Sequence, residues 1–225
     1  MYKYETHLHT APVSRCAKAS VRENLEYYKS HGYDGVFITN HFIGGNINID
    51  PSRPYAEKIE FYFSDYEEAL EIGKELGIQV FCGVELSHRG SDFLVYGLDK
   101  QWFLAHPDVM EMELPERLNF MMECGALVIQ AHPFREGTPM SLYHRCVQGV
   151  EVINANYMAT YQLVKLYCEH YDLLPFAGSD NHYPAKKALL AGIACRERIT
   201  SVEDMIQKVK SRQIEIFSKE VSPCI

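Results

Sequence analysis

Histidine and carboxylate residues recur in this sequence where short apolar segments end. In chain order they are His7, His9, His41, Glu85, His132, Asp180 and His182. Imidazole nitrogens and carboxylate oxygens are common ligands of divalent zinc, manganese and iron. Burying several of these groups together without a cation would leave polar atoms unpaired, at a cost of about 1–3 kcal/mol each. If the fold brings these residues together, they indicate a metal centre.

The spacing within two of the segments supports chelation. His7 and His9 are two positions apart, as are Asp180 and His182. Along an extended strand, side chains two positions apart point to the same face. Each pair could therefore bind one ion. The other histidines lack this context and are expected to be structural: His31, His88, His106, His144 and His170.

Strand-like and helix-like segments alternate along the chain. Apolar segments typical of buried strands cover residues 2–6, 36–39, 78–84, 93–96, 126–130, 150–153, 174–177 and 193–195. Helix signals open at two capping boxes and at three later positions, which are Ser20–Glu23, Ser64–Glu67, Pro115, Tyr157 and Ser201. The alternation predicts an α/β fold with a parallel sheet covered by helices, either a closed barrel or an open doubly wound sheet. In a barrel, the carboxyl ends of the strands meet at one mouth.

The segment from Phe42 to Phe63 departs from this alternation. It is polar and rich in proline, glycine and asparagine, and it is long for a connection between two core elements. Long loops in compact domains often carry function. We therefore expect this segment to be an active-site loop or lid.

Length and composition favour one globular domain over residues 1–225. Hydrophobic residues make up 47% of the chain and charged residues 23%, as in average folded domains. The chain has 22 Lys and Arg against 30 Asp and Glu, a net charge of −8, which argues against long nucleic acid as a partner. Seven cysteines without a Cys-x-x-Cys pair predict no disulfide framework. Because no export signal or membrane-spanning run is evident, we expect a cytoplasmic protein.

Five short motifs occur in an order that resembles the PHP family, named for polymerase and histidinol phosphatase domains. They are HLHT, ITNHF, GVELS, QAHPFR and GSDNH. The resemblance spans roughly residues 1–200. It implies a distorted seven-stranded (β/α) barrel that holds two or three divalent ions, zinc, manganese or iron, at its mouth and hydrolyses phosphate esters.

The resemblance also implies roles for the ligands. It assigns one metal to His7, His9, Glu85 and Asp180. Glu85 would bridge to a second metal that His132 also binds. A third metal would be bound by His41 and His182.

The chain departs from the family pattern at three positions. Asp92 stands in the strand after GVELS, where many relatives have histidine, and a carboxylate prefers harder ions than imidazole does. After HLHT, where an acid or histidine is common, the chain reads APVSRCAK, which leaves Cys16 as the nearest ligand candidate and Arg15 as a phosphate contact. Asn40 replaces a common aspartate, and this loss could weaken metal binding. Taken alone, Asp92 could equally be a solvent-facing charge, and Cys16 an inert thiol.

The implied chemistry is hydrolysis by a metal-activated water, without a protein nucleophile. The sequence contains no G-x-S-x-G motif and no phosphate-binding P-loop. Glu85 and Asp180 would act through the metals, Arg135 could contact the phosphate with two hydrogen bonds, and His88 is a candidate general acid on position alone. Lys186 and Lys187 follow the GSDNH motif closely and could reach the substrate, but adjacent lysines more often form a solvated face.

Three hypotheses about function follow. The first is a phosphomonoesterase that acts on a small phosphorylated metabolite, because divalent ions would make the mouth positive within an acidic protein. The second is a nuclease acting on short nucleic-acid ends. The third is a degenerate domain that binds metal or an anion without catalysis, which the three departures from the family pattern would explain.

Overall fold

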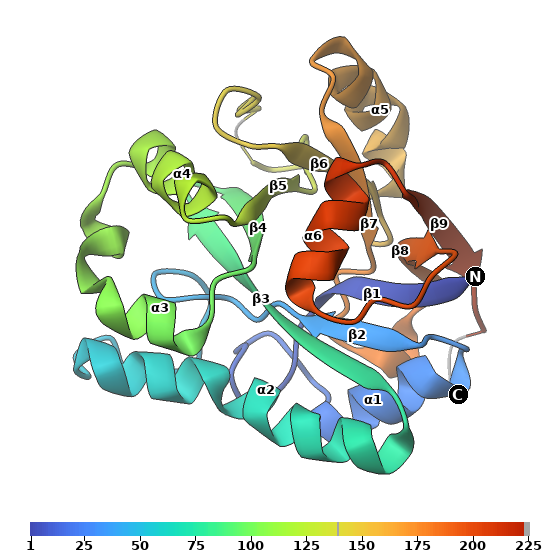
Figure 1. Ribbon diagram of the computed structural model, residues 1–225, viewed down its shortest axis with the longest axis horizontal. Coiled ribbons are helices and arrows are strands. Elements are labelled where there is room, and N and C mark those ends of the chain that lie inside the picture. The colour runs from blue at the N-terminus through green and yellow to red at the C-terminus, as the bar shows by residue number, and fades with distance from the viewer. Residues whose placement is uncertain (139, 223–225) are drawn as a thin grey trace.

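The computed structural model describes residues 1–138 and 140–222 as alternating strands and helices (Figure 1). The strands are β1 (Tyr2–Leu8), β2 (Gly35–Ile38), β3 (Gln79–His88), β4 (Ser91–Tyr96), β5 (Leu127–Ala131), β6 (Gly149–Asn154), β7 (Leu174–Gly178), β8 (Leu189–Cys195) and β9 (Ile214–Glu220). The α-helices are α1 (Val21–Ser30), α2 (Tyr55–Leu76), α3 (Lys100–Ala105), α4 (Leu114–Glu123), α5 (Tyr161–His170) and α6 (Val202–Lys210). The α/β class expected from the sequence is confirmed.

The described strands form one sheet in the order β7-β6-β5-β4-β3-β2-β1-β8-β9. It curls into a nearly closed barrel, with helices packed on its outer face in Figure 1. The sheet has nine strands rather than the seven expected. It is also mixed, because β4 and β8 run antiparallel to their neighbours. The prediction of a parallel sheet is therefore correct for the β1–β2–β3 and β5–β6–β7 pairings and wrong for those of β4 and β8.

A tight turn explains the reversal at β4. Arg89 and Gly90 connect β3 to β4, and the two strands pair through His88 and Ser91. Both turn residues have positive φ, 49° for Arg89 and 85° for Gly90, as in the type I′ turns that join antiparallel strands. As a consequence, the amino end of β4 lies at the same rim as the carboxyl end of β3.

The barrel closes where the chain after β7 meets β1. Leu8 and Asn181 form an isolated parallel bridge, and the His9 amide donates to the Asn181 carbonyl at 3.0 Å. The carboxylate of Glu5 accepts hydrogen bonds from the amides of His7 and Ser179 across the same seam. A buried side chain thus replaces part of the missing strand ladder.

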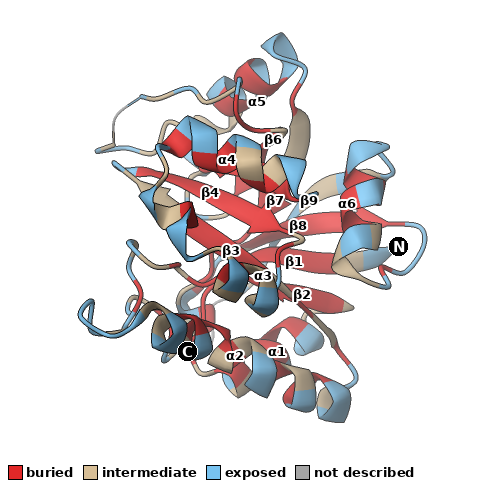
Figure 2. Ribbon diagram, turned by 60° about the vertical axis from the view of Figure 1, so that its left-hand side comes forward, coloured by how far each residue is buried: buried red, intermediate tan, exposed pale blue. Residues whose placement is uncertain are grey.

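Aromatic side chains pack across the interior of the barrel. Tyr96 on β4 donates its hydroxyl hydrogen bond to the Thr6 carbonyl on β1. The Tyr96 ring also contacts Phe37 on β2 and Phe176 on β7. Since β4 pairs only with β3 and β5, these contacts must cross the interior. Figure 2 shows the strands buried and the outer helix faces exposed, as expected for a sheet covered by helices.

The segment from Phe42 to Phe63 is loop only in its first part. Helix α2 begins at Tyr55, nine positions before the capping box expected at Ser64. The Ser64 hydroxyl lies inside this helix and donates to the Phe61 carbonyl. The expected helix start was wrong because the residues in front of Ser64 are also amphipathic, and Ile59, Tyr62 and Phe63 are buried on the same helix. Helix α3 and strand β9 were not anticipated either; β9 is a largely exposed edge strand with a weak apolar signal.

The first capping box forms as predicted. The Ser20 side chain accepts from the Glu23 amide, and the Glu23 carboxylate accepts from the Ser20 amide at 2.7 Å. Substituting an N-cap serine by alanine typically costs about 1 kcal/mol.

We expect the two serines to respond differently to alanine. Ser20→Ala should lower the free energy of unfolding by about 1 kcal/mol. Ser64→Ala should leave it unchanged or raise it by a few tenths of a kcal/mol, because alanine favours a helix interior. Urea unfolding followed by circular dichroism measures both. An equal loss in the two variants would contradict the assignment of the caps.

Candidate metal centre

The histidines and carboxylates expected to act together meet at one rim of the barrel. They come from the ends of strands or the residues just after them: His7 and His9 at β1, His41 after β2, Glu85 on β3, Asp92 on β4, His132 after β5, and Asp180 and His182 after β7. Asp92 reaches the rim because β4 runs in the opposite direction to β3. All of them are buried except His41 and His182, which are partly exposed. The convergence inferred from spacing is therefore present.

Glu85 lies at the centre of the cluster. Its Oε1 is 3.1 Å from His7 Nε2 and 3.4 Å from His132 Nε2. Its Oε2 is 2.7 Å from His41 Nδ1 and 3.4 Å from His9 Nε2. Each carboxylate oxygen thus faces a different pair of imidazoles. This is the arrangement required of a carboxylate that bridges neighbouring cations.

Asp180 faces the same imidazoles from the seam. Its Oδ1 is 3.4 Å from His9 Nε2 and 3.6 Å from His7 Nε2, and also 3.4 Å from His182 Nδ1. Its backbone has φ of 49°, in the left-handed region that is costly for residues other than glycine. Such strain is tolerated where the surrounding structure imposes it, often at functional sites.

Three groups of side chains among the described residues could each hold an ion, since the ligand atoms within each lie within 4.8 Å of one another. They are His7 with Glu85 and His132; His7 with His9 and Asp180; and His9 with Cys16, His41 and His182. These groups resemble the three sites implied by the motifs, but Glu85 is absent from the first site, His7 joins the second, and His9 joins the third. Cys16 also belongs to that group.

Hydrogen bonds on the far side of two rings orient their free nitrogens. His7 Nδ1 lies 3.0 Å from the Glu151 carboxylate, which can only accept. His9 Nδ1 lies 3.1 Å from the Ser14 hydroxyl, which itself donates to Asn40 Oδ1. In the neutral rings both Nδ1 atoms therefore carry the proton. The two Nε2 lone pairs then face each other at 3.3 Å, which favours a cation between them.

Two buried atoms of the cluster support the same conclusion. Within residues 1–138 and 140–222, Glu85 Oε2 and His41 Nδ1 lie 2.7 Å apart, but neither makes a well-formed hydrogen bond. An unsatisfied buried polar atom costs about 1–3 kcal/mol. A divalent ion coordinated by both would remove this cost, so the donor set fits a metal.

Charge within the cluster shifts the pKa values of its members. Burial lowers the pKa of His7, but the carboxylates of Glu151, Asp180 and Glu85 outweigh it and raise the pKa well above its usual value. Burial opposes the ionisation of Glu85, yet His41 and His7 hold its pKa well below the usual range. Without a metal, the carboxylates thus favour protons on His7 and His41, whereas burial lowers the pKa of His9 well below its usual value. A metal ion would displace those protons.

Glu151 was not anticipated from the sequence, although it orients two predicted ligands. Its carboxylate accepts from His7 Nδ1 and, at 3.0 Å, from the His132 amide. Asn154 donates to the same carboxylate at 2.8 Å. The available signal was an acidic residue inside the apolar segment 150–153, because a buried acid in a strand needs a partner.

Asn40 takes part in a second network beside the cluster. Its side-chain oxygen accepts from the Thr10 amide and the Ser14 hydroxyl, both at 2.7 Å. Its amide group donates to Asp65 on α2 at 3.2 Å. Burial raises the pKa of the Asp65 carboxyl. An aspartate is common at position 40 in the family. Here Asp65, which accepts a hydrogen bond from the Asn40 amide, supplies a carboxylate beside that position instead.

Arg135 lies on the outer side of the cluster. Its guanidinium is 3.5 Å from Asp92 Oδ2 and sits over the Tyr157 ring at 6.0 Å from the centroid. Tyr157 also packs edge-on against His132. Asp92 is buried, and His132 Nε2 is 3.8 Å from its Oδ2. The alternative of a solvent-facing Asp92 is therefore wrong.

Other predicted residues lie apart from the cluster or are engaged elsewhere. Lys187 is buried, and its ammonium donates to the Ser179 carbonyl at 2.7 Å, so the expectation of a solvated face is wrong for it. Lys186 is exposed, with its ammonium 5.1 Å from the Tyr183 ring centroid. His88 sits at the β3–β4 turn; its role as a general acid stays a prediction, without support from its placement.

The cysteines, Arg15 and the helices bear on three further sequence expectations. The described cysteines are free thiols, as expected, and Cys224 lies outside the described residues. Arg15 is exposed, and its guanidinium donates to the Ile47 carbonyl at 3.2 Å; its contact with phosphate stays a prediction. None of the described helices has the length and apolar character needed to cross a membrane.

Comparison with known proteins gives structural likeness only. No family model matches the sequence, and no curated protein matches it. A two-domain protein from Bacteroides vulgatus that contains a predicted PHP-like metal-dependent phosphoesterase superposes with a TM-score of 0.73 at 15% identity, over 96% of this chain and 64% of that chain. The chain has the PHP fold. The PHP-like α/β barrel implied by the five motifs is thus confirmed, although its sheet has nine strands rather than seven.

Two more solved structures superpose on most of this chain. A protein from Bifidobacterium adolescentis that is described as a metal-dependent phosphoesterase superposes with a TM-score of 0.57 at 14% identity, covering 94% of this chain and 96% of that one. An amidohydrolase from Chromobacterium violaceum, with bound sulfate and no metal, gives 0.58 at 13%, covering 94% and 97%. Identities of this size establish the fold and leave the reaction to be argued from the site.

Glu151→Gln should weaken metal binding without unfolding the barrel. Gln has nearly the same size but lacks the charge that holds the proton on His7 Nδ1, and loss of such a partner typically costs 10–100-fold in metal affinity. Competition with a fluorescent zinc chelator measures the change. Glu169→Gln, on the exposed face of α5, is the matched control and should bind as the unchanged chain does. Equal affinity of all three proteins would contradict the role of Glu151.

Metal affinity should rise with pH between about 6 and 8. In the metal-free chain the pKa of His7 is well above its usual value and that of His41 is about 10, so both rings are protonated there. Each must release a proton to bind a metal. Calorimetric titration with zinc in buffers of different ionisation enthalpy counts the released protons. An affinity that stays constant or falls with rising pH would be inconsistent with these rings as ligands.

Proposed function

We propose that this protein is a metal-dependent phosphoesterase that hydrolyses a small phosphate monoester. The observation that carries the proposal is Glu85, a buried carboxylate whose two oxygens each face a different pair of imidazoles. Such a site is suited to two or more neighbouring cations. Two-metal sites of this kind serve the in-line displacement of phosphate esters.

The ligand groups described above would hold the ions. When bound, divalent ions lower the pKa of water toward neutrality and neutralise charge on the attacking and leaving oxygens. The chain's part is to fix the ligands, and it does so through the buried carboxylate of Glu151 and the Ser14 hydroxyl. Zinc, manganese and iron all suit a mixture of imidazole and carboxylate ligands.

Cationic and aromatic side chains at the rim support an anionic substrate. Arg135 reaches the rim beside Tyr157 and is only partly buried. Arginine binds phosphate oxygens with two parallel hydrogen bonds. Lys186, next to Tyr183, lines a pocket together with Asp180 and His182. A phosphoryl group bound at this rim would meet positively charged side chains although the protein as a whole is acidic.

The pocket beside the cluster is small. It has a volume of about 260 Å³ and is lined by Asn156, Asp180, His182, Tyr183, Lys186 and Lys187. A larger pocket, of about 430 Å³, is lined by residues such as Trp102 and Glu203 and includes no member of the cluster. The small pocket favours a metabolite-sized ester. The net charge of −8 disfavours a nucleic-acid substrate, because duplex binding relies on basic contacts.

The test is hydrolysis of p-nitrophenyl phosphate by the chain loaded with manganese or zinc. We expect turnover that a chelator abolishes and added metal restores. Asp180→Asn should remove it almost completely, since it removes the negative charge of the only carboxylate in the group with His7 and His9. Arg135→Met should raise KM roughly tenfold or more, the equivalent of a charged hydrogen bond, whereas Arg22→Met on the exposed face of α1 should not.

The alternative functions give different results in the same assay. Faster turnover of a short oligonucleotide than of a mononucleotide would favour a nuclease. Hydrolysis of amides but not of esters would follow the amidohydrolase neighbour instead. A chain that holds its metals and hydrolyses none of these substrates would be a degenerate binding domain, and the proposal would be rejected.

A further inference from the structure

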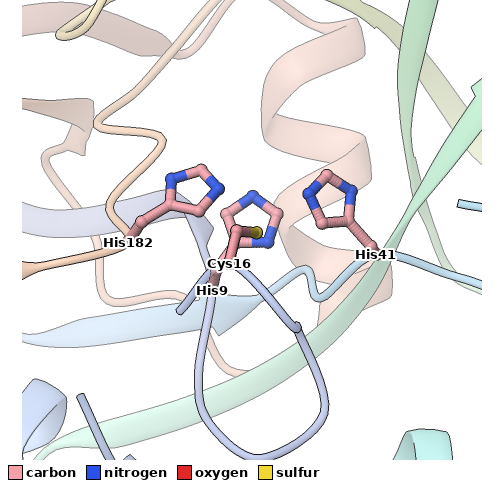
Figure 3. Close-up of side chains that lie close together, drawn as sticks. All are labelled: His9, Cys16, His41 and His182. Atoms are coloured by element: carbon pink, nitrogen blue, oxygen red, sulfur yellow. The ribbon is translucent and has the colours of Figure 1, made fainter. Parts of the chain in front are cut away.

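A thiol completes the third group of the metal centre. Cys16 lies with His9, His41 and His182, and one ligand atom from each falls within 4.8 Å of the others. Figure 3 shows the rings of His182 and His41 on either side, with the sulfur of Cys16 in front of the His9 ring between them. Three imidazoles and one sulfur make a set of four potential ligands.

Backbone hydrogen bonds hold Cys16 at this position from both sides. The Arg15 amide donates to the Asn46 carbonyl at 3.0 Å, and the Lys18 amide donates to the His182 carbonyl at 2.8 Å. The turn that carries Cys16 is therefore tied to the loop after β2 and to a member of the group itself. The Ser14 hydroxyl in the same turn accepts from the His41 amide at 3.1 Å. The same short segment thus positions the thiol and two of the imidazoles.

The other described cysteines have different surroundings. The thiols of Cys82, Cys146 and Cys168 lie against backbone carbonyls, as does that of Cys195. Cys124 is exposed at the end of α4. Among the described cysteines, Cys16 is the one whose sulfur faces imidazole nitrogens. A small hydrophobe filling space would not require that environment.

We propose that Cys16 binds the third ion as a thiolate, so that this site has one sulfur and three imidazole ligands and selects zinc over manganese or magnesium. This proposal rests on the metal centre of the proposed function and specifies the ligand and metal of its outermost site. Binding breaks the S–H bond, forms a sulfur–zinc bond and releases the proton to solvent. Soft thiolate favours zinc, whereas carboxylate oxygens favour harder ions.

The two groups built around Glu85 and Asp180 contrast with this one. They contain carboxylate oxygens as well as imidazole nitrogens, and no sulfur. The centre would then be mixed. The two groups that contain Glu85 or Asp180 would accept manganese or iron, and the group that contains Cys16 would retain zinc. The departure from the family pattern at this position then changes the metal rather than removing the site.

Cobalt provides a direct readout without substrate. The full chain loaded with Co²⁺ should show a strong near-ultraviolet charge-transfer absorption, which arises only when sulfur is bound to the metal. Cys16→Ser should lose this absorption and bind zinc at the third site more than about 100-fold more weakly, beyond the loss expected for a residue that only orients a ligand. Cys124→Ser is the matched control and should keep both properties.

Two further measurements guard against a variant that merely misfolds. Cys16→His should retain the third zinc by elemental analysis while losing the charge-transfer absorption. In the unmutated chain, iodoacetamide should alkylate Cys16 without metal and spare it when zinc is bound, as mass spectrometry of the peptide would reveal. Charge-transfer absorption that persists in Cys16→Ser, or equal alkylation with and without zinc, would overturn the assignment.

These outcomes separate this proposal from the proposed function. A chain with the cobalt absorption and protected Cys16 but no phosphatase activity would keep the thiolate assignment and reject the reaction. A chain that hydrolyses phosphate esters without the absorption would keep the reaction and reject Cys16 as a ligand.

Discussion

The structure depends on one electrostatic constraint, which is that buried carboxylates and imidazole lone pairs at a single rim need positive charge between them. Glu85 and Asp180 are buried within 4 Å of several imidazole nitrogens. Isolated buried charge is costly, and hydrogen bonds on the far sides of His7 and His9 leave their lone pairs facing inward. Protons can supply the charge in the metal-free chain. Divalent ions would supply more of it, and each of the three groups has the ligand atoms to hold one.

Two irregularities of the barrel, the antiparallel β4 and the seam between β1 and β7, bring these groups together at one rim. A uniformly parallel sheet would place the amino end of the fourth strand at the opposite rim, and the antiparallel β4 instead brings Asp92 beside His132. The seam between β1 and β7 has few ladder bonds, and the buried carboxylate of Glu5 compensates by bonding amides on both sides. That seam is also where Asp180 takes up its left-handed conformation. The close approach of β7 to β1 requires glycine at position 178, because a Cβ atom there would lie 2.4 Å from the Cβ of His7.

A second layer of polar residues decides how well the ligands are oriented. Glu151 bonds both the His7 ring and the His132 backbone. Asn40 connects Ser14, and through it His9, to Asp65 on α2. The helix that covers the sheet thus contributes to the site as well as to the core. Partners of this kind tune metal affinity strongly even though they do not touch the ion.

The sequence by itself determined the ligand types and the alternating elements, because residue chemistry and apolar periodicity are local properties. The spacing of His7 with His9, the box at Ser20 and the strand-end positions of Glu85 and Asp180 could all be recognised without coordinates. Only the tertiary structure decided the direction of β4, the closure at the seam and the start of α2.

The structure alone also placed Glu151 against the His7 ring, and it brought Cys16, until then only a candidate, beside His9, His41 and His182. These features arise from contacts between residues far apart in the chain, which no local pattern encodes. A buried acid in a strand, or a single cysteine in a loop, acquires its role only when the sheet closes and sets its neighbours.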